Sequence, residues 1–155
     1  MAGWYNKVIA DLAELPDCID YFESELAHAR GTDLQLKGKP IERLSAEMPG
    51  IVEQRYNQLQ EIEAILEYLN AELRRIRSIY FRKYLENYNR ALTARDAEKY
   101  IDGEAEVVGM AALINEFALL RNRWLGLHKA LETKNFQINN IVKLRTAGLD
   151  DATIM

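Results

Sequence analysis

The stretch "LQEIEAILEYLNAELRRIRSIYFRKY", residues 59–84, determines the fold. Its large apolar residues alternate at spacings of three and four, namely Leu59, Ile62, Leu66, Leu69, Leu73, Ile76 and Tyr80. This heptad pattern predicts an α-helix with one apolar face and excludes a strand. No Gly or Pro occurs between Ile51 and Gly103. We therefore predict a helix over residues 52–92, roughly 60 Å long, which needs partners along its length.

The last third of the chain repeats this pattern. Its apolar residues follow the same alternating spacing, namely Leu113, Phe117, Leu120, Trp124, Leu127 and Leu131, and the pattern resumes at Ile138 and Ile141. Asp102 is the predicted N-cap of this second long helix, and Gly148 marks its predicted end. The segment "TKNFQINN", residues 133–140, predicts a kink or break near Asn135.

A short connector, "TARDAEKYIDG" (residues 93–103), separates the two long helices. Thr93 and Asp96 have the spacing of a capping box, so we expect a short helix that ends at Gly103. Two long helices joined by a short connector fold back on each other as a hairpin.

The chain before residue 50 predicts smaller elements. Two short helices, residues 4–15 and 16–30, are expected to separate at Pro16, followed by a loop with a possible extended piece at residues 34–36. Pro49 is predicted to be the first residue of the long helix. The fold class is therefore all-α: a long antiparallel helical hairpin with extra N-terminal helices and a C-terminal oligomerisation helix. We divide it into a helical extension (1–35), a main domain (36–148) and an acidic tail (149–155).

Composition limits the class of protein. At 155 residues the chain corresponds to about one domain, and no apolar run approaches the ~18–20 residues that a membrane-spanning helix needs. The N-terminus lacks an uninterrupted apolar segment, so we expect no signal peptide. Cys18 is the single cysteine, which favours a reduced, cytoplasmic setting.

Catalytic and metal-binding patterns are absent from the sequence. There is no GxxxxGK[ST] phosphate loop and no GxGxxG turn. His28 and His128 are far apart, and the Glu25–His28 pair is a single ExxH where a di-iron bundle needs two. We predict no enzyme, no cofactor and no metal site.

The net charge of −4 conceals two basic segments. Residues 74–90 and residues 119–145 each carry six cations against one carboxylate. A symmetrical hairpin would place Arg74 opposite Asn122 and would merge the two segments into one basic belt. Such a belt suits a phosphate backbone, because each neutralised phosphate releases counterions.

Aromatic residues accompany the cations. Phe81 and Tyr88 are candidates for exposure, where bases of a single strand could stack on them, whereas Tyr80, Tyr84 and Trp124 fit the apolar seam. The candidate DNA-binding residues are Arg74, Arg75, Arg77, Phe81, Arg82, Lys83, Arg121 and Arg123. The alternative is an ordinary solvated face whose arginines contact no ligand.

Three segments in this order resemble the UvsY recombination mediators of tailed phages. They are the long helix through "RRIRSIYFRKY", the connector end "KYIDGEAEVV", and "LETKNFQINNIVKLRTAG". The likeness covers about residues 36–147. It implies a non-enzymatic, ring-shaped homo-oligomer that binds single-stranded DNA. It further implies that the protein helps a RecA-like recombinase displace the single-strand-binding protein, in the host cytoplasm if the chain is phage-encoded.

The segment "FQINNIVKLR", residues 136–145, is rich in apolar residues. We predict that it contacts a neighbouring subunit through Phe136, Ile138, Ile141, Val142 and Leu144. The alternative is that it folds back on the helices at the N-terminus of its own chain. A different class of function also stays open, namely a helical adaptor or structural assembly protein without nucleic-acid binding.

Overall fold

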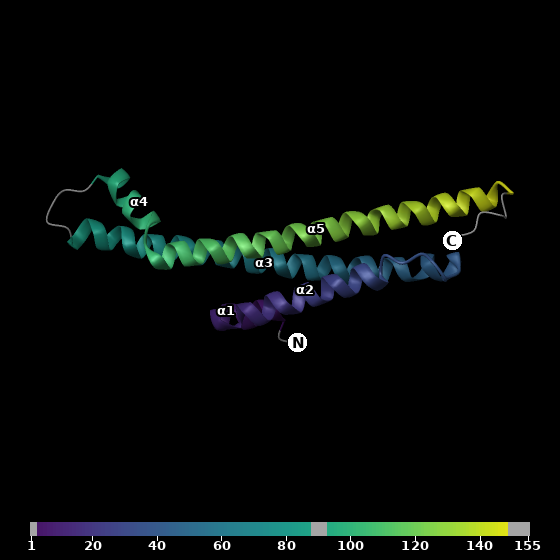
Figure 1. The fold of residues 1–155 in the computed structure, drawn as a ribbon, viewed down its shortest axis with the longest axis horizontal. Helices are drawn as coiled ribbons and strands as arrows, with labels where there is room; N and C mark the ends of the chain where they lie inside the picture. Colours follow the sequence, from purple (N-terminus) through teal and green to yellow (C-terminus); the bar gives the residue numbers. More distant parts are fainter. Residues whose placement is uncertain (1–2, 88–92, 149–155) are drawn as a thin grey trace.

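A computed structural model describes residues 3–87 and 93–148 (Figure 1). A 3-10 turn at Leu12–Glu14 precedes the second of its five α-helices. The α-helices are α1 (Trp4–Ala10), α2 (Leu15–Thr32), α3 (Ile41–Asn87), α4 (Ala94–Asp102) and α5 (Ala105–Thr146). No strand occurs within the described residues, so the all-α prediction is confirmed.

The helices α3 and α5 form the predicted long antiparallel pair, and α2 packs along the middle of that pair (Figure 1). The main core lies where these three helices meet. Its large buried side chains are Phe22, Ile62, Leu69, Phe117 and Trp124. A smaller apolar cluster of Ile41, Leu44, Met48 and Ile138 joins the start of α3 to the end of α5. The alternating spacing of apolar residues in the sequence therefore marks the face that each of the two long helices buries.

The N-terminal helices separate at Asp11, not at Pro16. The Asp11 side chain accepts a hydrogen bond from the Ala13 amide at 3.0 Å, while Pro16 lies in the first turn of α2, where a missing N–H costs nothing. α2 runs through Gly31, and residues 34–36 form no strand. Residues of α1 and α2 belong to the same hydrophobic core as residues of α3 and α5. The predicted division at residue 35 therefore does not separate two cores.

The predicted start of the long helix at Pro49 and the predicted break near Asn135 are both wrong. Pro49 lies inside α3, which begins eight residues earlier at Ile41, and α5 is continuous through Asn135. In both places packing overrides the local signal, since Leu44 and Met48 on one helix bury Ile138 on the other. The segment after Asn135 is therefore the last part of α5 and no separate helix.

The connector forms the predicted short helix. The Thr93 hydroxyl caps α4 by accepting a hydrogen bond from the Asp96 amide at 3.2 Å. Asp102 is the last residue of α4, so its prediction as the N-cap of α5 is wrong, and Glu104 occupies that position. Gly148 has a φ of 83°, which a terminating glycine readily adopts, and it follows the end of α5 as predicted.

The register of the hairpin differs from the symmetrical one. The Tyr84 hydroxyl donates to the Glu104 carboxylate, the Tyr56 and His128 rings lie 5.7 Å apart, and Ile138 contacts the region of Met48. These contacts place Arg74 level with a position near residue 111, about 16 Å along the helix from Asn122. The cause is α4, which packs against α3 and lets α5 begin level with Tyr80.

Candidate nucleic-acid interface

The shifted register separates the two predicted basic segments. Glu106 of α5, and not Arg121 or Arg123, is the α5 charge that lies near Arg75 and Lys83 of α3. Arg123 forms a loose ion pair with Glu23 of α2 at 3.7 Å, and Arg121 donates to the neighbouring Asn122 side chain at 3.1 Å. The prediction of one continuous belt is therefore wrong, and only the α3 cations remain grouped.

The distal part of α3, residues 72–87, carries that group of cations, which we call the α3 basic face. Three of its arginines have carboxylate partners in the chain. Arg74 lies 3.5 Å from Glu67, Arg75 lies 2.9 Å from Glu72, and Arg77 pairs with Asp102 of α4. The hydrogen bonds that Arg75 donates to the Glu72 carboxylate raise the pKa of Arg75, so this guanidinium stays charged.

Arg82 and Lys83 form no ion pair with a carboxylate of the described residues. Both side chains are exposed, and the Lys83 ammonium lies 5.8 Å from the centre of the Tyr80 ring. Because no carboxylate of the described residues pairs with them, these two cations are the most available of the group to an external anion.

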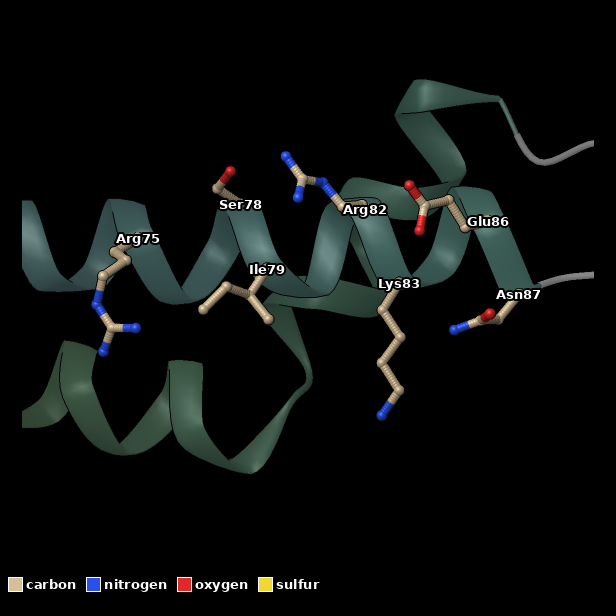
Figure 2. Close-up of a pocket in the computed structure, with 7 residues that line it drawn as sticks. All are labelled: Arg75, Ser78, Ile79, Arg82, Lys83, Glu86 and Asn87. Carbon is tan, nitrogen blue, oxygen red and sulfur yellow. The ribbon is translucent and has the colours of Figure 1, made fainter.

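A shallow groove of about 380 Å³ runs along the α3 basic face (Figure 2). Figure 2 shows Arg75 and Lys83 extending toward one side of α3 and Arg82 toward the other, with Ile79 between them. The residues that line the groove are Arg75, Ser78, Ile79, Arg82, Lys83, Glu86 and Asn87. The Ile79 side chain is 54% exposed, so the floor of the groove is apolar while its edges are cationic. Sequence reasoning did not single out Ile79.

The predicted aromatic platform is less exposed than expected. Phe81 is half-buried, and together with Ile101 of α4 it lines a second hollow of about 250 Å³. Tyr84 stacks on Tyr100 of α4 at 5.8 Å, and Trp124 is buried in the core as predicted. Tyr88 lies outside the described residues. The face therefore offers charge and apolar surface, with Phe81 as a partly covered ring.

Two cations that sequence reasoning missed are buried. The Arg55 side chain is 4% exposed and bonds the Glu25 and Asp33 carboxylates, each at 2.6 Å, which fastens α2 to α3. Lys134 lies on α5, and its ammonium group donates a hydrogen bond to the backbone carbonyl of Asp33. A signal existed in the sequence, since Arg55 lies four residues before Leu59 and Lys134 three after Leu131, both on the apolar seams.

Two groups at these contacts, Glu25 and Lys134, have shifted pKa values. The hydrogen bond from Arg55 lowers the pKa of the Glu25 carboxyl, against the opposing effect of burial. Burial, and then the nearby charge of Lys39, lowers the pKa of the Lys134 ammonium. Glu25 therefore belongs to an ion pair that links α2 to α3. This structural role explains the glutamate of the single ExxH motif.

The predicted oligomerisation residues divide into two groups. Ile138 is buried against Leu44 and Met48 at the start of α3 in its own chain, so for this residue the prediction is wrong. Ile141 is partly buried against the same cluster. The segment thus packs on α3, whereas the stated alternative placed it on the N-terminal helices. Phe136, Val142 and Leu144 are exposed, and Phe136 is the most open at 69%.

Other candidate chemistry is sparse in the described part of the chain. No group of three or more His, Cys, Asp or Glu side chains gathers there as a metal site requires. Burial raises the pKa of the Cys18 thiol to about 12, which makes it an unreactive core residue. Of the described helices, none is both long enough and apolar enough to cross a membrane.

Comparison with known proteins adds no relative. No family model, no curated protein and no solved structure matches this chain.

Proposed function

We propose that this protein binds single-stranded DNA through the α3 basic face and acts as a recombination mediator. The observation that carries the proposal is the pair Arg82 and Lys83, which the described chain leaves without a carboxylate partner beside a groove with an apolar floor. Phosphates would contact the cations, and the released counterions would drive binding. An unpaired base would find apolar surface at Ile79 and at the open edge of Phe81.

The acidic neighbours of the face limit its affinity. Glu86 lines the groove, and Glu106 of α5 lines a neighbouring hollow together with Arg75 and Lys83. A single copy therefore offers few phosphate contacts, so several copies on one strand would be needed for tight binding. This requirement agrees with the mediator role that the resemblance to the UvsY family implies, in which a RecA-like recombinase and a single-strand-binding protein are the partners.

Fluorescence polarisation of a labelled single-stranded oligonucleotide at low salt tests the proposal. The variant carries Arg75→Ala, Arg82→Ala and Lys83→Ala together, and we expect it to lose at least tenfold in affinity. The matched control removes three exposed cations elsewhere, by Arg43→Ala, Lys129→Ala and Lys143→Ala. Equal affinity in the two triple variants would mean that binding follows overall charge, and no binding by the wild type would refute the proposal.

The mediator role has a separate test. With a RecA-like recombinase and DNA covered by its single-strand-binding protein, the wild type should shorten the lag before the recombinase hydrolyses ATP. The Arg75/Arg82/Lys83 triple variant should leave the lag unchanged. A protein that binds DNA but does not alter the lag would keep the binding proposal and remove the mediator role.

The rival function is a helical adaptor without nucleic-acid binding. One observation favours it: the outer face of α5 is apolar and exposed, as Val108 (53%) and Leu119 (58%) show. A protein that ignores oligonucleotides at low salt would support this reading.

A further inference from the structure

A hollow of about 520 Å³ lies between the first third of α3 and the second half of α5. We call it the Pro49 hollow, and neither α2 nor the α3 basic face contributes a residue to it. A hollow that combines apolar surface with a few polar groups is the usual form of a small-molecule site. Its apolar lining is Met48, Pro49 and Val52, and its polar lining is Ser45, Glu53, Tyr56, His128 and Asn135.

Pro49 leaves a hydrogen-bond acceptor open at this hollow. Inside a helix, each residue normally donates its N–H to the carbonyl four positions earlier, but proline has no N–H. The Ser45 carbonyl therefore has no donor at position 49, which lies inside α3. A helical carbonyl points toward the residue four positions later, and both Ser45 and Pro49 line the hollow. This carbonyl can thus accept a hydrogen bond from a bound molecule.

His128 brings a second open acceptor from α5. Its Nε2 atom lies 3.3 Å from a Glu132 carboxylate oxygen, which favours the proton on Nε2 and leaves the lone pair of the neutral ring at Nδ1. Nδ1 is buried and has no hydrogen-bond partner in the described part of the chain. Such atoms are rare in folded proteins, because each one costs stability until a donor reaches it.

The charge at the Pro49 hollow is negative. Glu53 lines it, and no lysine or arginine is among the described residues of its lining. Glu53 forms no ion pair with a described residue, and Glu132 adds a second carboxylate beside His128. The sign is opposite to that of the α3 basic face. Carboxylates next to open acceptors favour a ligand that carries positive charge and several N–H donors.

We infer that the Pro49 hollow binds an aliphatic diammonium ion. The first ammonium donates to the Ser45 carbonyl and to the Glu53 carboxylate, since one such group has three donors. Helical side chains lean toward the N-terminus of their helix, so Glu53 reaches back toward Ser45. The methylene chain of the ligand then covers the apolar surface of the hollow, which removes it from water.

The second ammonium lies at the other end of the hollow, beside Tyr56 and His128. Tyr56 follows Pro49 by seven residues, so the two ends are about 10 Å apart along α3. The Tyr56 ring lies 5.7 Å from the His128 ring and is 46% exposed, so it has room to turn and admit the ammonium to Nδ1. The face of this ring also attracts a cation. With Glu132 nearby, each end of the ligand has one carboxylate.

The inference does not depend on nucleic-acid binding. The Pro49 hollow ends at Tyr56, whereas Arg75, Arg82 and Lys83 lie in the distal part of α3. The Arg75/Arg82/Lys83 triple variant should therefore bind the diamine as the wild type does. Failure of DNA binding and failure of diamine binding are thus separate results.

An NMR titration with 1,6-diaminohexane at low salt gives the first test. The methyl groups of Met48 and Val52 and the ring of Tyr56 should shift and reach saturation. Two comparison molecules should bind about tenfold more weakly: n-hexylammonium, which lacks the second ammonium, and 1,2-diaminoethane, which is too short to reach both ends. No saturable shift at these residues, or equal affinity for either comparison molecule, would overturn the inference.

A matched pair of carboxylate variants tests the charge. Glu53→Gln should weaken the binding of 1,6-diaminohexane about tenfold, because a charged hydrogen bond is lost. Glu116→Gln removes the same charge from an exposed position of α5 outside the hollow and should keep the affinity of the wild type. Equal weakening in the two variants would mean that the diamine follows overall charge, which would overturn the site.

Pro49→Ala tests the open carbonyl. The alanine N–H can donate to Ser45, so the variant should unfold at higher urea concentration and yet bind 1,6-diaminohexane several-fold more weakly. The control is Gly50→Ala, whose added Cβ meets nothing within 4 Å. It should also stabilise α3 but should keep the affinity of the wild type. Full affinity in Pro49→Ala, or the same loss in Gly50→Ala, would contradict the assigned contact.

Discussion

The middle of the molecule and its distal arm use the same residue types for different purposes. In the middle, α2 adds a third helix to the α3–α5 pair, and the cations Arg55 and Lys134 are buried and bonded. In the arm, beyond Leu69, α3 has no further fully buried residue among those described. Its cations are exposed except for the half-buried Arg77. The number of packed helices therefore decides whether an arginine holds the fold or remains available to a ligand.

The largest effect on stability should come from the middle. Trp124→Ala removes a side chain that is 1% exposed and meets the Phe22 ring edge-on at 6.0 Å. We expect a loss of about 3–5 kcal/mol in the free energy of unfolding, measured by urea titration. The control Phe136→Ala, at an exposed site of the same helix, should change it by no more than about 0.5 kcal/mol. Similar losses in the two variants would contradict the assigned core.

The second effect concerns the buried cation. Arg55→Ala leaves Glu25 and Asp33 without their partner, which should cost about 3 kcal/mol by the same measurement. Arg43→Ala breaks an exposed pair with Glu47 and should cost no more than about 0.5 kcal/mol. If both variants matched the wild type, the Arg55 contacts would not fasten α2 to α3.

The same contacts predict a pH dependence. Arg55 lowers the pKa of Glu25 in the folded chain below its ordinary value of 4.5. Its contribution is therefore complete above pH 4.5 and is lost as the pH falls through the folded-state pKa. The wild type should lose stability in this acid range more steeply than Glu25→Gln, as urea titrations at several pH values would show. Parallel curves for the two proteins would contradict the shift.

The smallest effect belongs to the arm. Arg77→Ala removes the ion pair with Asp102 that links α3 to α4, but both side chains are more than one-third exposed. We expect a change within about 0.5 kcal/mol in the free energy of unfolding. A loss of unfolding free energy close to that of Arg55→Ala would show that the Arg77–Asp102 ion pair stabilises the arm as strongly as the Arg55 ion pairs stabilise the middle.

The apolar spacing of the sequence was sufficient to predict the helices and their antiparallel pairing, because it records which face each helix buries. It could not predict that α3 and α5 continue through Pro49 and Asn135. A proline inside a helix costs roughly 3 kcal/mol, and the contacts of Met48 and Leu44 with Ile138, which are distant in sequence, offset that cost.

The candidate site was predicted in part. Charge density located the α3 basic face, since Arg82 and Lys83 remain exposed there. The register of α5 against α3 depends on how α4 packs on α3, where Ile101 is buried and Asp102 pairs with Arg77. The sequence does not indicate how α4 is oriented relative to α3. For this reason the prediction that Arg121 and Arg123 lie beside the α3 cations was wrong. Charged residues on an apolar seam, as at Arg55 and Lys134, were the overlooked signal.

The most direct test of the central claim is the salt dependence of single-stranded DNA binding. The claim is that the exposed cations of the arm contact phosphates while the buried cations do not. For the wild type, the logarithm of the affinity should fall linearly with the logarithm of salt concentration. The Arg75/Arg82/Lys83 triple variant should have a slope about 2 units shallower, because three phosphate contacts are lost. A slope that the triple variant leaves unchanged, or no binding at low salt, would contradict the account.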